Sequence, residues 1–201
     1  MDKKVNALSS DIVKEYGLNA GASIVGIAAA KDFCLAPEGF KPTDIMKECL
    51  SVIVLGTPSP KEALLKTSIE YTANRNVMLN KMTNTAKTVA KKLTTQGYKA
   101  KAISASGGKT VDGKLYGHIS LKHAAELAGL GHINRIYLLT NTQHGQLLWL
   151  SAVLTNADLP QDKEAQYKTC DNCNKCVKTF PSEALNDPTI FGKKECTKFL
   201  P

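Results

Sequence analysis

Ser51-Val52-Ile53-Val54-Leu55 is a strongly apolar stretch in which β-branched residues predominate. Such a run is typical of a buried strand. The Gly56-Thr57-Pro58 segment that follows interrupts the pattern, because glycine and proline weaken the interior of a strand. We therefore expect a buried strand over residues 51–55.

The sequence on either side of this run predicts further elements. Residues 23–28, 98–104 and 146–154 have the pattern of strands, and the glycines of 107–113 mark a loop or hairpin. Helical periodicity extends over 5–18, 61–96 and 121–128. Ser120 is expected to cap the last helix. The apolar face of the long helix is predicted to contain Val77, Met82, Ala86, Val89, Ala90 and Leu93.

Composition places the chain among soluble globular proteins. Of its 201 residues, 43% are hydrophobic and 22% are charged. No apolar run reaches the about 18 residues needed to span a bilayer. The N-terminal residues read as an amphipathic helix without the apolar segment of a signal peptide. We therefore expect a cytoplasmic protein whose six cysteines are thiols or metal ligands rather than disulfides.

The positive charge is concentrated in one stretch. The net charge is +8, and residues 71–111 contain no Asp or Glu. An acidic redox protein, a nucleic acid or a phosphorylated ligand could bind there, although a solvated lysine-rich helix face is the simpler explanation. We expect a redox partner protein rather than a nucleic acid, and no membrane. The basic residues are Arg75, Lys81, Lys87, Lys91, Lys92, Lys99, Lys101 and Lys109.

The character of the chain changes after Pro160. Residues 161–201 are polar, rich in Lys, Asn and Thr, and contain too little apolar material for a core of their own. Short segments of this kind usually need a metal to fold. We predict a core domain over residues 1–160 and an iron–sulfur cluster-binding segment over residues 161–201.

The cysteine spacing in this segment indicates the metal. Cys170, Cys173 and Cys176, followed by Phe180-Pro181, match the iron–sulfur pattern C-x2-C-x2-C-x3-C-P except at its last cysteine. In two-cluster ferredoxins that last cysteine ligates the other cluster, so its loss leaves one cluster in need of a distant ligand. Cys196 can supply it at a modest cost in loop entropy. We predict one [4Fe–4S] cluster on these four cysteines.

Two other ligand arrangements remain open. A structural zinc ion could use the same four thiols, although zinc sites usually show two C-x2-C pairs. A cluster could also have three protein ligands and an open iron, with Cys196 unligated. Cys34 and Cys49 stand apart in the sequence, and we expect both to be buried thiols that bind no metal.

Three features in a fixed order resemble the epoxyqueuosine reductase-like iron–sulfur proteins. They are the A-A-x-x-A-G-L-G segment of residues 124–131, the strand ending at residue 155 and the cysteine run. Residues 36–39, 51–56 and 112–117 resemble the short, ferredoxin-like members of that group. The resemblance spans residues 24–196. It implies an α+β fold: a nitroreductase-like mixed sheet flanked by helices, with a small ferredoxin-type iron–sulfur tail.

The resemblance also implies chemistry. The full-length relatives, epoxyqueuosine reductase and the reductive dehalogenases, bind a corrinoid and use iron–sulfur clusters to reduce its cobalt. This chain departs from them in two places. Asn134-Arg135-Ile136 stands where the reductases have Gly-Lys-Asn, and the carboxylate nearest to the position of their proton donor is Asp112. We therefore do not transfer tRNA-modifying activity to this chain.

Three residues near residue 130 are candidate cofactor contacts. Gly129 and Gly131 could let a cofactor approach the backbone, and His132 could donate a proton or bind a corrinoid. Their simpler roles are helix C-cap glycines and an exposed loop histidine.

We expect an oxidoreductase in which one cluster passes single electrons to a cofactor or substrate held by the core. A corrinoid-dependent reductase is the second possibility, and it predicts a cobalamin-sized cavity near residues 120–135 and measurable binding of the corrinoid. A non-catalytic module, whose tail is folded by a structural metal, is the third.

Overall fold

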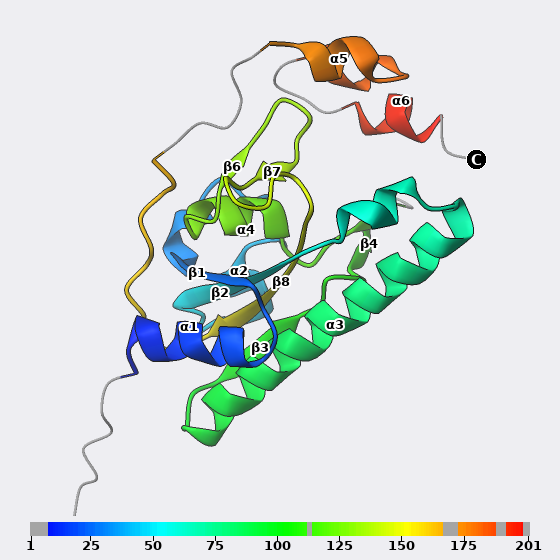
Figure 1. The fold of residues 1–201 in the computed structure, drawn as a ribbon. Coiled ribbons are helices and arrows are strands. Elements are labelled where there is room, and N and C mark those ends of the chain that lie inside the picture. The colour runs from blue at the N-terminus through cyan, green and yellow to red at the C-terminus, as the bar shows by residue number, and fades with distance from the viewer. Residues whose placement is uncertain (1–7, 112–113, 167–172, 188–191, 199–201) are drawn as a thin grey trace, which may run out of the picture.

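The computed structural model describes residues 8–111, 114–166, 173–187 and 192–198. Its centre is a four-stranded sheet in the order β1-β2-β8-β3 (Figure 1). The strand β2 lies inside the sheet, and its residues 51–57 are buried, so the predicted buried strand is confirmed. Its predicted end at residue 55 is wrong, because residues 56–58 continue the pairing with β8. The strands are β1 (Ile24–Ala29), β2 (Ser51–Pro58), β3 (Ala100–Ile103) and β8 (Leu148–Thr155).

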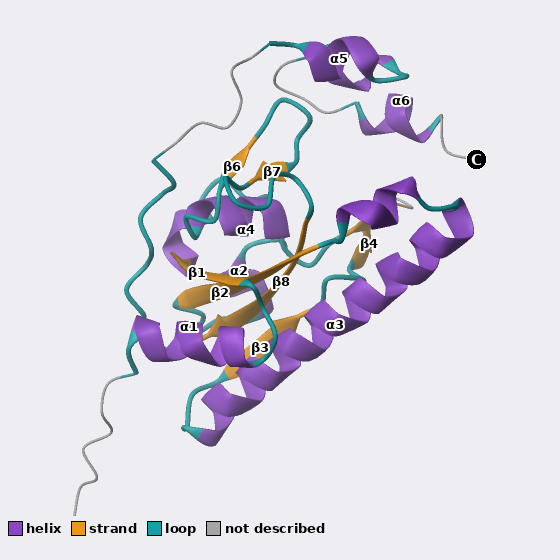
Figure 2. Cartoon of the chain, in the orientation of Figure 1, coloured by secondary structure: helices purple, strands orange, loops and turns teal. Residues whose placement is uncertain are grey.

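Helices cover both faces of the sheet (Figure 2). The helices α1 (Ser10–Asn19) and α3 (Ser68–Thr95) pack on one face, and α4 (Leu121–Leu127) packs on the other. Side chains of successive residues of β2 point to opposite faces of the sheet and pack into two separate cores. Ile53 lies in the core under α1 and α3, whereas Val54 lies in the core under α4. The continuous apolar run is therefore explained by burial on both faces.

The predicted α+β class is confirmed, but the expected mixed sheet is wrong for the described strands. Every neighbouring pair in the four-stranded sheet is antiparallel. The chain does make a crossover from β2 through α3 to β3, and these two strands run in the same direction. They are not neighbours, because β8 lies between them and is antiparallel to both.

The predicted long helix is divided near its start. It consists of η2 (Lys61–Leu65) and α3, which begins after Thr67. Thr67 and Glu70 form a reciprocal capping box, which fixes this start. Val77 was expected on the buried face but is 64% exposed, because the first turns of α3 extend beyond the sheet (Figure 1). None of the helices in the described ranges is long and apolar enough to cross a membrane.

Two small hairpins and three short connecting elements complete the core. The hairpin of β4 (Lys109–Val111) and β5 (Lys114–Tyr116) was predicted from its glycines, although residues 112–113 lie outside the described ranges. The hairpin of β6 and β7 was not predicted, because strands of two residues show no alternation. The other elements are β6 (His132–Ile133), β7 (Leu139–Thr140), η1 (Ala30–Asp32), α2 (Pro42–Ile45) and η2.

The segment after residue 160 remains attached to the core. The backbone N–H of Asp162 donates to the carbonyl of Ile27 at 2.8 Å, and its carboxylate accepts from the N–H of Ile27 at 2.9 Å. Further along lie α5 (Lys175–Thr179), η3 (Glu183–Leu185) and α6 (Lys193–Thr197). The helix α6 packs against η3. The domain boundary at residue 160 stays a prediction.

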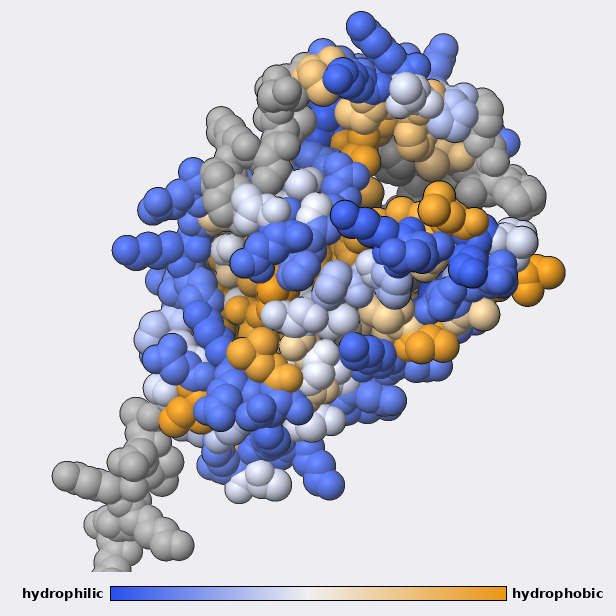
Figure 3. Space-filling view, viewed as in Figure 1, coloured by the Kyte–Doolittle hydropathy of each residue, from blue (hydrophilic) through white to orange (hydrophobic). Residues whose placement is uncertain are grey.

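Exposed apolar side chains gather on η2 and on the first turns of α3. Figure 3 shows this surface at the right of the molecule, below the segment that contains α5 and α6. The side chains are Leu64, Leu65, Ile69 and Val77.

Candidate functional site

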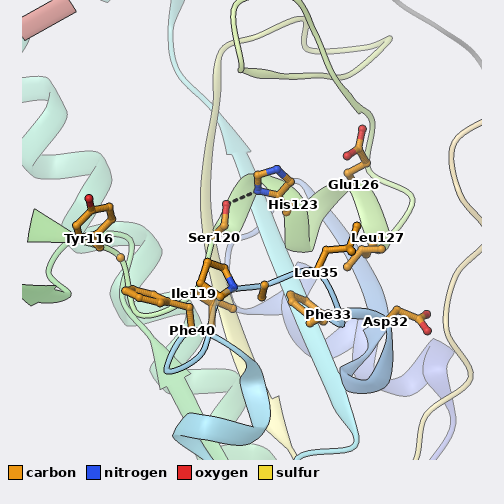
Figure 4. A pocket seen from close by; sticks show the side chains of 13 residues that line it. Asp32, Phe33, Leu35, Phe40, Tyr116, Ile119, Ser120, His123, Glu126 and Leu127 are labelled. Atoms are coloured by element: carbon orange, nitrogen blue, oxygen red, sulfur yellow. Dashed lines mark hydrogen bonds between the residues drawn. The ribbon is translucent and has the colours of Figure 1, made fainter. Parts of the chain in front are cut away.

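A pocket of about 570 Å³ opens beside the first turns of α4. Its volume falls within the range of about 300–1,000 Å³ that is typical of small-molecule sites. Figure 4 shows side chains from the loop after β1, from β5 and from α4 around it. The lining residues are mostly apolar, with the aromatic side chains Phe33, Phe40 and Tyr116 and the polar side chains Asp32, Ser120, His123 and Glu126.

Aromatic contacts join two separate parts of the chain into one wall of the pocket. The rings of Phe40 and Tyr116 meet edge to face, with centroids 5.8 Å apart and planes at 65°. Such pairs are favourable beyond the area that they bury. The ammonium group of Lys109 lies 5.3 Å from the centroid of Phe40 and donates to the carbonyl of Gly39. The loop of residues 32–40 is thereby held against the hairpin of β4 and β5.

Ser120 and His123 form a polar pair on the α4 side of the pocket. Ser120 occupies the N-cap position of α4, as predicted, but its side chain makes no capping hydrogen bond. Its hydroxyl lies 2.6 Å from Nδ1 of His123 (Figure 4). Burial lowers the pKa of His123, Lys122 lowers it further, and Glu126 opposes the shift. At neutral pH the imidazole is therefore uncharged.

The charged neighbours of His123 have partners of their own. The ammonium group of Lys122 donates to the carbonyl of Tyr137 at 2.9 Å, and burial lowers the pKa of this lysine. The carboxylate of Glu126 accepts from the N–H of Ile133 at 2.8 Å. These bonds join α4 to the segment that contains β6 and the turn after it.

The structure gives the three candidate cofactor contacts roles within the protein. Gly129 and Gly131 have φ of +71° and +155°, and a Cβ on either would collide with a backbone oxygen, of Lys163 and Thr140 respectively. The Nε2 of His132 donates to the carbonyl of Ala165 at 2.6 Å. None of the three lines the pocket described above. Their role as cofactor contacts stays a prediction.

The predicted metal ligands are described in part. Cys170 lies outside the described residues. Cys173 precedes Asn174, whose left-handed backbone (φ 57°) forms a turn before α5, and Cys176 lies in α5. Cys196 lies in α6, and Figure 1 shows α5 and α6 at the same end of the molecule.

The described cysteines fit a cluster in their chemistry, because none of them forms a disulfide and thiolates are the ligands that iron–sulfur clusters use. Within the described ranges, no three side chains of Cys, His, Asp or Glu come together in a metal-binding group. The ligand set therefore stays a prediction.

The other two cysteines differ from each other. Cys49 is buried, as expected, and burial raises the pKa of its thiol to about 11. Cys34 was expected to be buried, but it is exposed. It lies in the loop of residues 32–40, between two residues whose side chains line the pocket. An apolar loop sequence does not by itself indicate burial, and here the loop packs only in part against the core.

The segment that lines the pocket also binds the tail. Arg135, in the turn between β6 and β7, donates to the carbonyl of Asp187 at 2.9 Å and to that of Asn186 at 3.3 Å. The hydroxyl of Tyr137 lies 3.5 Å from the same carbonyl of Asp187. Residues 116–127 thus contribute to the pocket, and residues 132–137 contact the chain on both sides of the cysteine run.

Sequence reasoning did not single out His123 or the aromatic wall. The spacing of Ser120 and His123, three residues apart on a predicted helix, places the two side chains on one face. The sequence thus contains a signal for this pair, although a serine at the start of a helix also predicts an N-cap. The meeting of Phe40 and Tyr116 depends on contacts between distant parts of the chain, which helical or strand periodicity does not reveal.

Comparisons with known proteins agree with the resemblance inferred from the sequence. No family model matches the chain. The chain is 36% identical over 75 residues to epoxyqueuosine reductase of Synechococcus sp. (strain RCC307), a match that covers 37% of this chain and 23% of that relative. It is 29% identical over 84 residues to epoxyqueuosine reductase of Bacillus subtilis (strain 168), covering 42% of this chain and 22% of that relative. The matches thus span about a quarter or less of the relatives' length.

Solved structures share the fold over most of the chain. A crystal structure of epoxyqueuosine reductase with an epoxyqueuosine-modified tRNA stem loop matches with a TM-score of 0.66 at 18% identity, covering 94% of this chain and 56% of that one. A reductive dehalogenase whose structure suggests a mechanism for B12-dependent dehalogenation matches with a TM-score of 0.69 at 19% identity, covering 91% of this chain and 27% of that one. The chain is therefore similar in sequence to epoxyqueuosine reductases over part of its length, and it has the α+β fold that they share with the reductive dehalogenases.

Proposed function

We propose that this chain is an iron–sulfur oxidoreductase in which one [4Fe–4S] cluster passes single electrons to a cofactor or substrate held in the pocket beside α4. The cluster would be bound by Cys170, Cys173, Cys176 and Cys196. When bound, it would supply one-electron transfer at a potential set by its ligands and their hydrogen bonds.

One observation carries the proposal: a single continuous segment lines the pocket and also contacts the tail that contains the predicted cluster ligands. Residues 116–127 contribute to the pocket wall, and residues 132–137 bind the tail through His132 and Arg135. Electron transfer needs a donor and an acceptor held in fixed relation. The bonds of Lys122 to Tyr137 and of Glu126 to Ile133 join the two halves of this segment.

The test is a redox titration of the chain purified without oxygen, followed by electron paramagnetic resonance. The proposal predicts one spin per chain on reduction and one midpoint between about −700 and +450 mV, the range of protein iron–sulfur clusters. Cys196→Ser is expected to abolish or alter the signal, whereas Cys34→Ser, a matched change outside the ligand set, is expected to preserve it. A chain that binds stoichiometric zinc and shows no midpoint would support the non-catalytic alternative.

A corrinoid-dependent reductase is a second candidate. It is supported by the likeness in fold to a protein of B12-dependent dehalogenation. The pocket takes only part of its wall from the range of residues 120–135 where a cobalamin-sized cavity is expected, and its volume is about 570 Å³. Equilibrium ultrafiltration with hydroxocobalamin tests the corrinoid candidate. Ala36→Phe, which fills the pocket, is expected to weaken retention of the corrinoid, and Leu65→Phe, on the exposed surface of η2, is expected to leave it unchanged. Equal retention by both variants would contradict this candidate.

The sequence and the comparisons suggest two kinds of binding partner. We infer an acidic redox protein as the electron donor, because the chain has a net charge of +8. A nucleic acid is a further candidate, since a protein of the same fold has been solved with a tRNA stem loop.

A further inference from the structure

We propose that the pocket beside α4 binds a neutral, planar ring that carries a hydrogen-bond acceptor, such as a carbonyl oxygen or ring nitrogen, and that His123 donates the hydrogen bond that recognises it. Ser120 is the positioning residue that selects the donating form of the imidazole. The inference rests on the proposed role of this pocket as the ligand site, and it adds the class of ligand and the residue that binds it.

The shape and lining of the pocket indicate the ring. Phe33, Phe40 and Tyr116 supply aromatic surface, and Ile119 and other aliphatic side chains fill in between them. Aromatic surfaces favour stacked or edge-to-face contact with another ring. The 5.8 Å contact of Phe40 with Tyr116 fixes the position of two of these rings before any ligand binds. A preformed aromatic wall reduces the entropy lost on binding.

The charges around the pocket indicate that the ligand is not an anion. The lining includes the carboxylates of Asp32 and Glu126, and no Lys or Arg is among the lining residues, all of which the structure describes. Two lysines lie nearby, and both are engaged elsewhere. Lys122 donates to the carbonyl of Tyr137, and Lys109 donates to that of Gly39. An anionic ring would therefore meet two like charges in the pocket lining, whereas the two nearby ammonium groups lie outside that lining and donate to backbone carbonyls.

The pairing of Ser120 with His123 indicates where the imidazole carries its hydrogen. A neutral imidazole has one nitrogen that donates and one that accepts. The Ser120 hydroxyl lies 2.6 Å from Nδ1, and either group of this pair can be the donor. We assign the hydroxyl as the donor, which places the imidazole hydrogen on Nε2. The ring is neutral because of its burial and because of Lys122, in spite of the opposing effect of Glu126. Nε2–H is then a donor on a side chain that lines the pocket.

Alternative uses of the same residues fit less well. A serine nucleophile activated by His123 would need a carboxylate to orient the imidazole. Glu126 is the nearest carboxylate in the sequence, but it accepts from the N–H of Ile133 at 2.8 Å and lies 3.6 Å from Nδ1 of His132, so its contacts are with the segment after α4. The geometry therefore favours a hydrogen-bond donor over a nucleophile.

A matched pair of probes tests the ligand class. The full chain, labelled with ¹⁵N, is titrated with 1-naphthamide and with 1-naphthoate, which share a ring system and differ in charge. The amide is expected to shift the imidazole resonances of His123 and to bind at least about fivefold more tightly than the carboxylate. Binding of the carboxylate as tight as that of the amide, or no shift of His123 with either probe, would overturn the proposal.

Variants test the residues. His123→Phe, which keeps a ring without a donor, is expected to weaken amide binding about fivefold, and His123→Gln, which keeps an N–H donor, is expected to restore part of it. In Ser120→Ala, the imidazole ¹⁵N resonances of His123 are expected to move away from the values typical of the Nε2–H tautomer. In Ser120→Thr, which keeps the hydroxyl, they are expected to stay at those values. Unchanged affinity in His123→Phe, with an intact amide spectrum, would overturn the role of His123. Because these readouts need no cluster, failure here is separate from failure of the redox titration.

Discussion

The guanidinium group of Arg135 donates a 2.9 Å hydrogen bond to the main-chain carbonyl of Asp187. This bond joins the turn between β6 and β7 to the segment between η3 and α6, and the adjacent carbonyl of Asn186 accepts a second bond from the same side chain. The cysteines of α5 and α6 lie on either side of this point, so Arg135 is one of the residues that hold the cysteine-containing tail against the core.

Replacing Arg135 is expected to loosen the tail and to leave the core intact. Arg135→Ala removes both bonds, so hydrogen exchange of amides in residues 175–187 and 192–198 should increase about tenfold, while the free energy of unfolding of the core changes by less than about 1 kcal/mol. Arg75→Ala, at an exposed arginine of α3, is the control and should change neither. Exchange in the tail that is unaffected by the loss of Arg135 would show that other contacts hold it.

Gly129 is expected to tolerate no side chain. Gly129→Ala adds a Cβ against the backbone oxygen of Lys163 and strains a left-handed φ, so it should cost about 3 kcal/mol in urea unfolding. Gly97→Ala, at a φ of +90° with no atom within 4 Å of the added Cβ, bears only the strain and should cost about 1 kcal/mol. Equal losses in the free energy of unfolding for the two variants would mean that the segment after Pro160 can shift to accommodate the added Cβ.

Cys34 and Cys49 are expected to differ sharply in reactivity. The pKa of Cys49 is raised to about 11, so its thiolate fraction at pH 8 is about two orders of magnitude below that of an ordinary thiol. Iodoacetamide should label the exposed Cys34 within minutes and Cys49 only after unfolding, as read by peptide mass spectrometry. Rapid labelling of Cys49 in the folded chain would contradict its burial.

The raised pKa of the Cys49 thiol predicts that the stability of the fold depends on pH. A thiol whose pKa is higher in the folded state binds its proton more tightly there, so its contribution is complete below the unfolded pKa of about 8.5. The contribution of the protonated Cys49 thiol to the free energy of unfolding is lost as the pH rises towards about 11. Cys49→Ala should reduce this loss of stability between the two pH values.

Two neighbours are expected to move the pKa of His123 in opposite directions. Lys122 lowers this pKa and Glu126 raises it, so Lys122→Gln should raise it and Glu126→Gln should lower it further. Imidazole resonances followed by NMR from pH 4 to 8 measure both changes. Since the folded pKa lies below the usual value, the stability due to neutral His123 is present at neutral pH and is lost as the pH falls below about 6.5. Shifts of the same sign in both variants would contradict the assigned charges.

The sequence predicted the elements more reliably than their pairing. The apolar run of residues 51–55 indicated a buried strand because burial on both faces removes the need for polar alternation. The position of β8 between β2 and β3 could not be predicted, because it depends on a contact between strands about 50 residues apart or more. The exposure of Val77 escaped prediction for a related reason. Helical spacing shows which face is apolar, but not how far the sheet extends beneath the helix.

The candidate site was predicted unevenly. The cysteine motif is local and could be read directly, although its first member lies outside the described residues. Gly129 and Gly131 were noted for close backbone approach, and the close approach is that of the chain's own carbonyls. The pocket draws its walls from residues 32–40, 116–120 and 123–127, which no single motif joins. His123 is recognised as a candidate site residue only in the structure, from its contact with Ser120.

The most direct test of the proposed cluster is the iron and acid-labile sulfide content of the chain purified without oxygen, measured for wild type, Cys196→Ser and Cys34→Ser. The account predicts about four irons and four sulfides per chain in the wild type and in Cys34→Ser, and their loss in Cys196→Ser. Stoichiometric zinc in place of iron, or a full cluster that persists in Cys196→Ser, would contradict it.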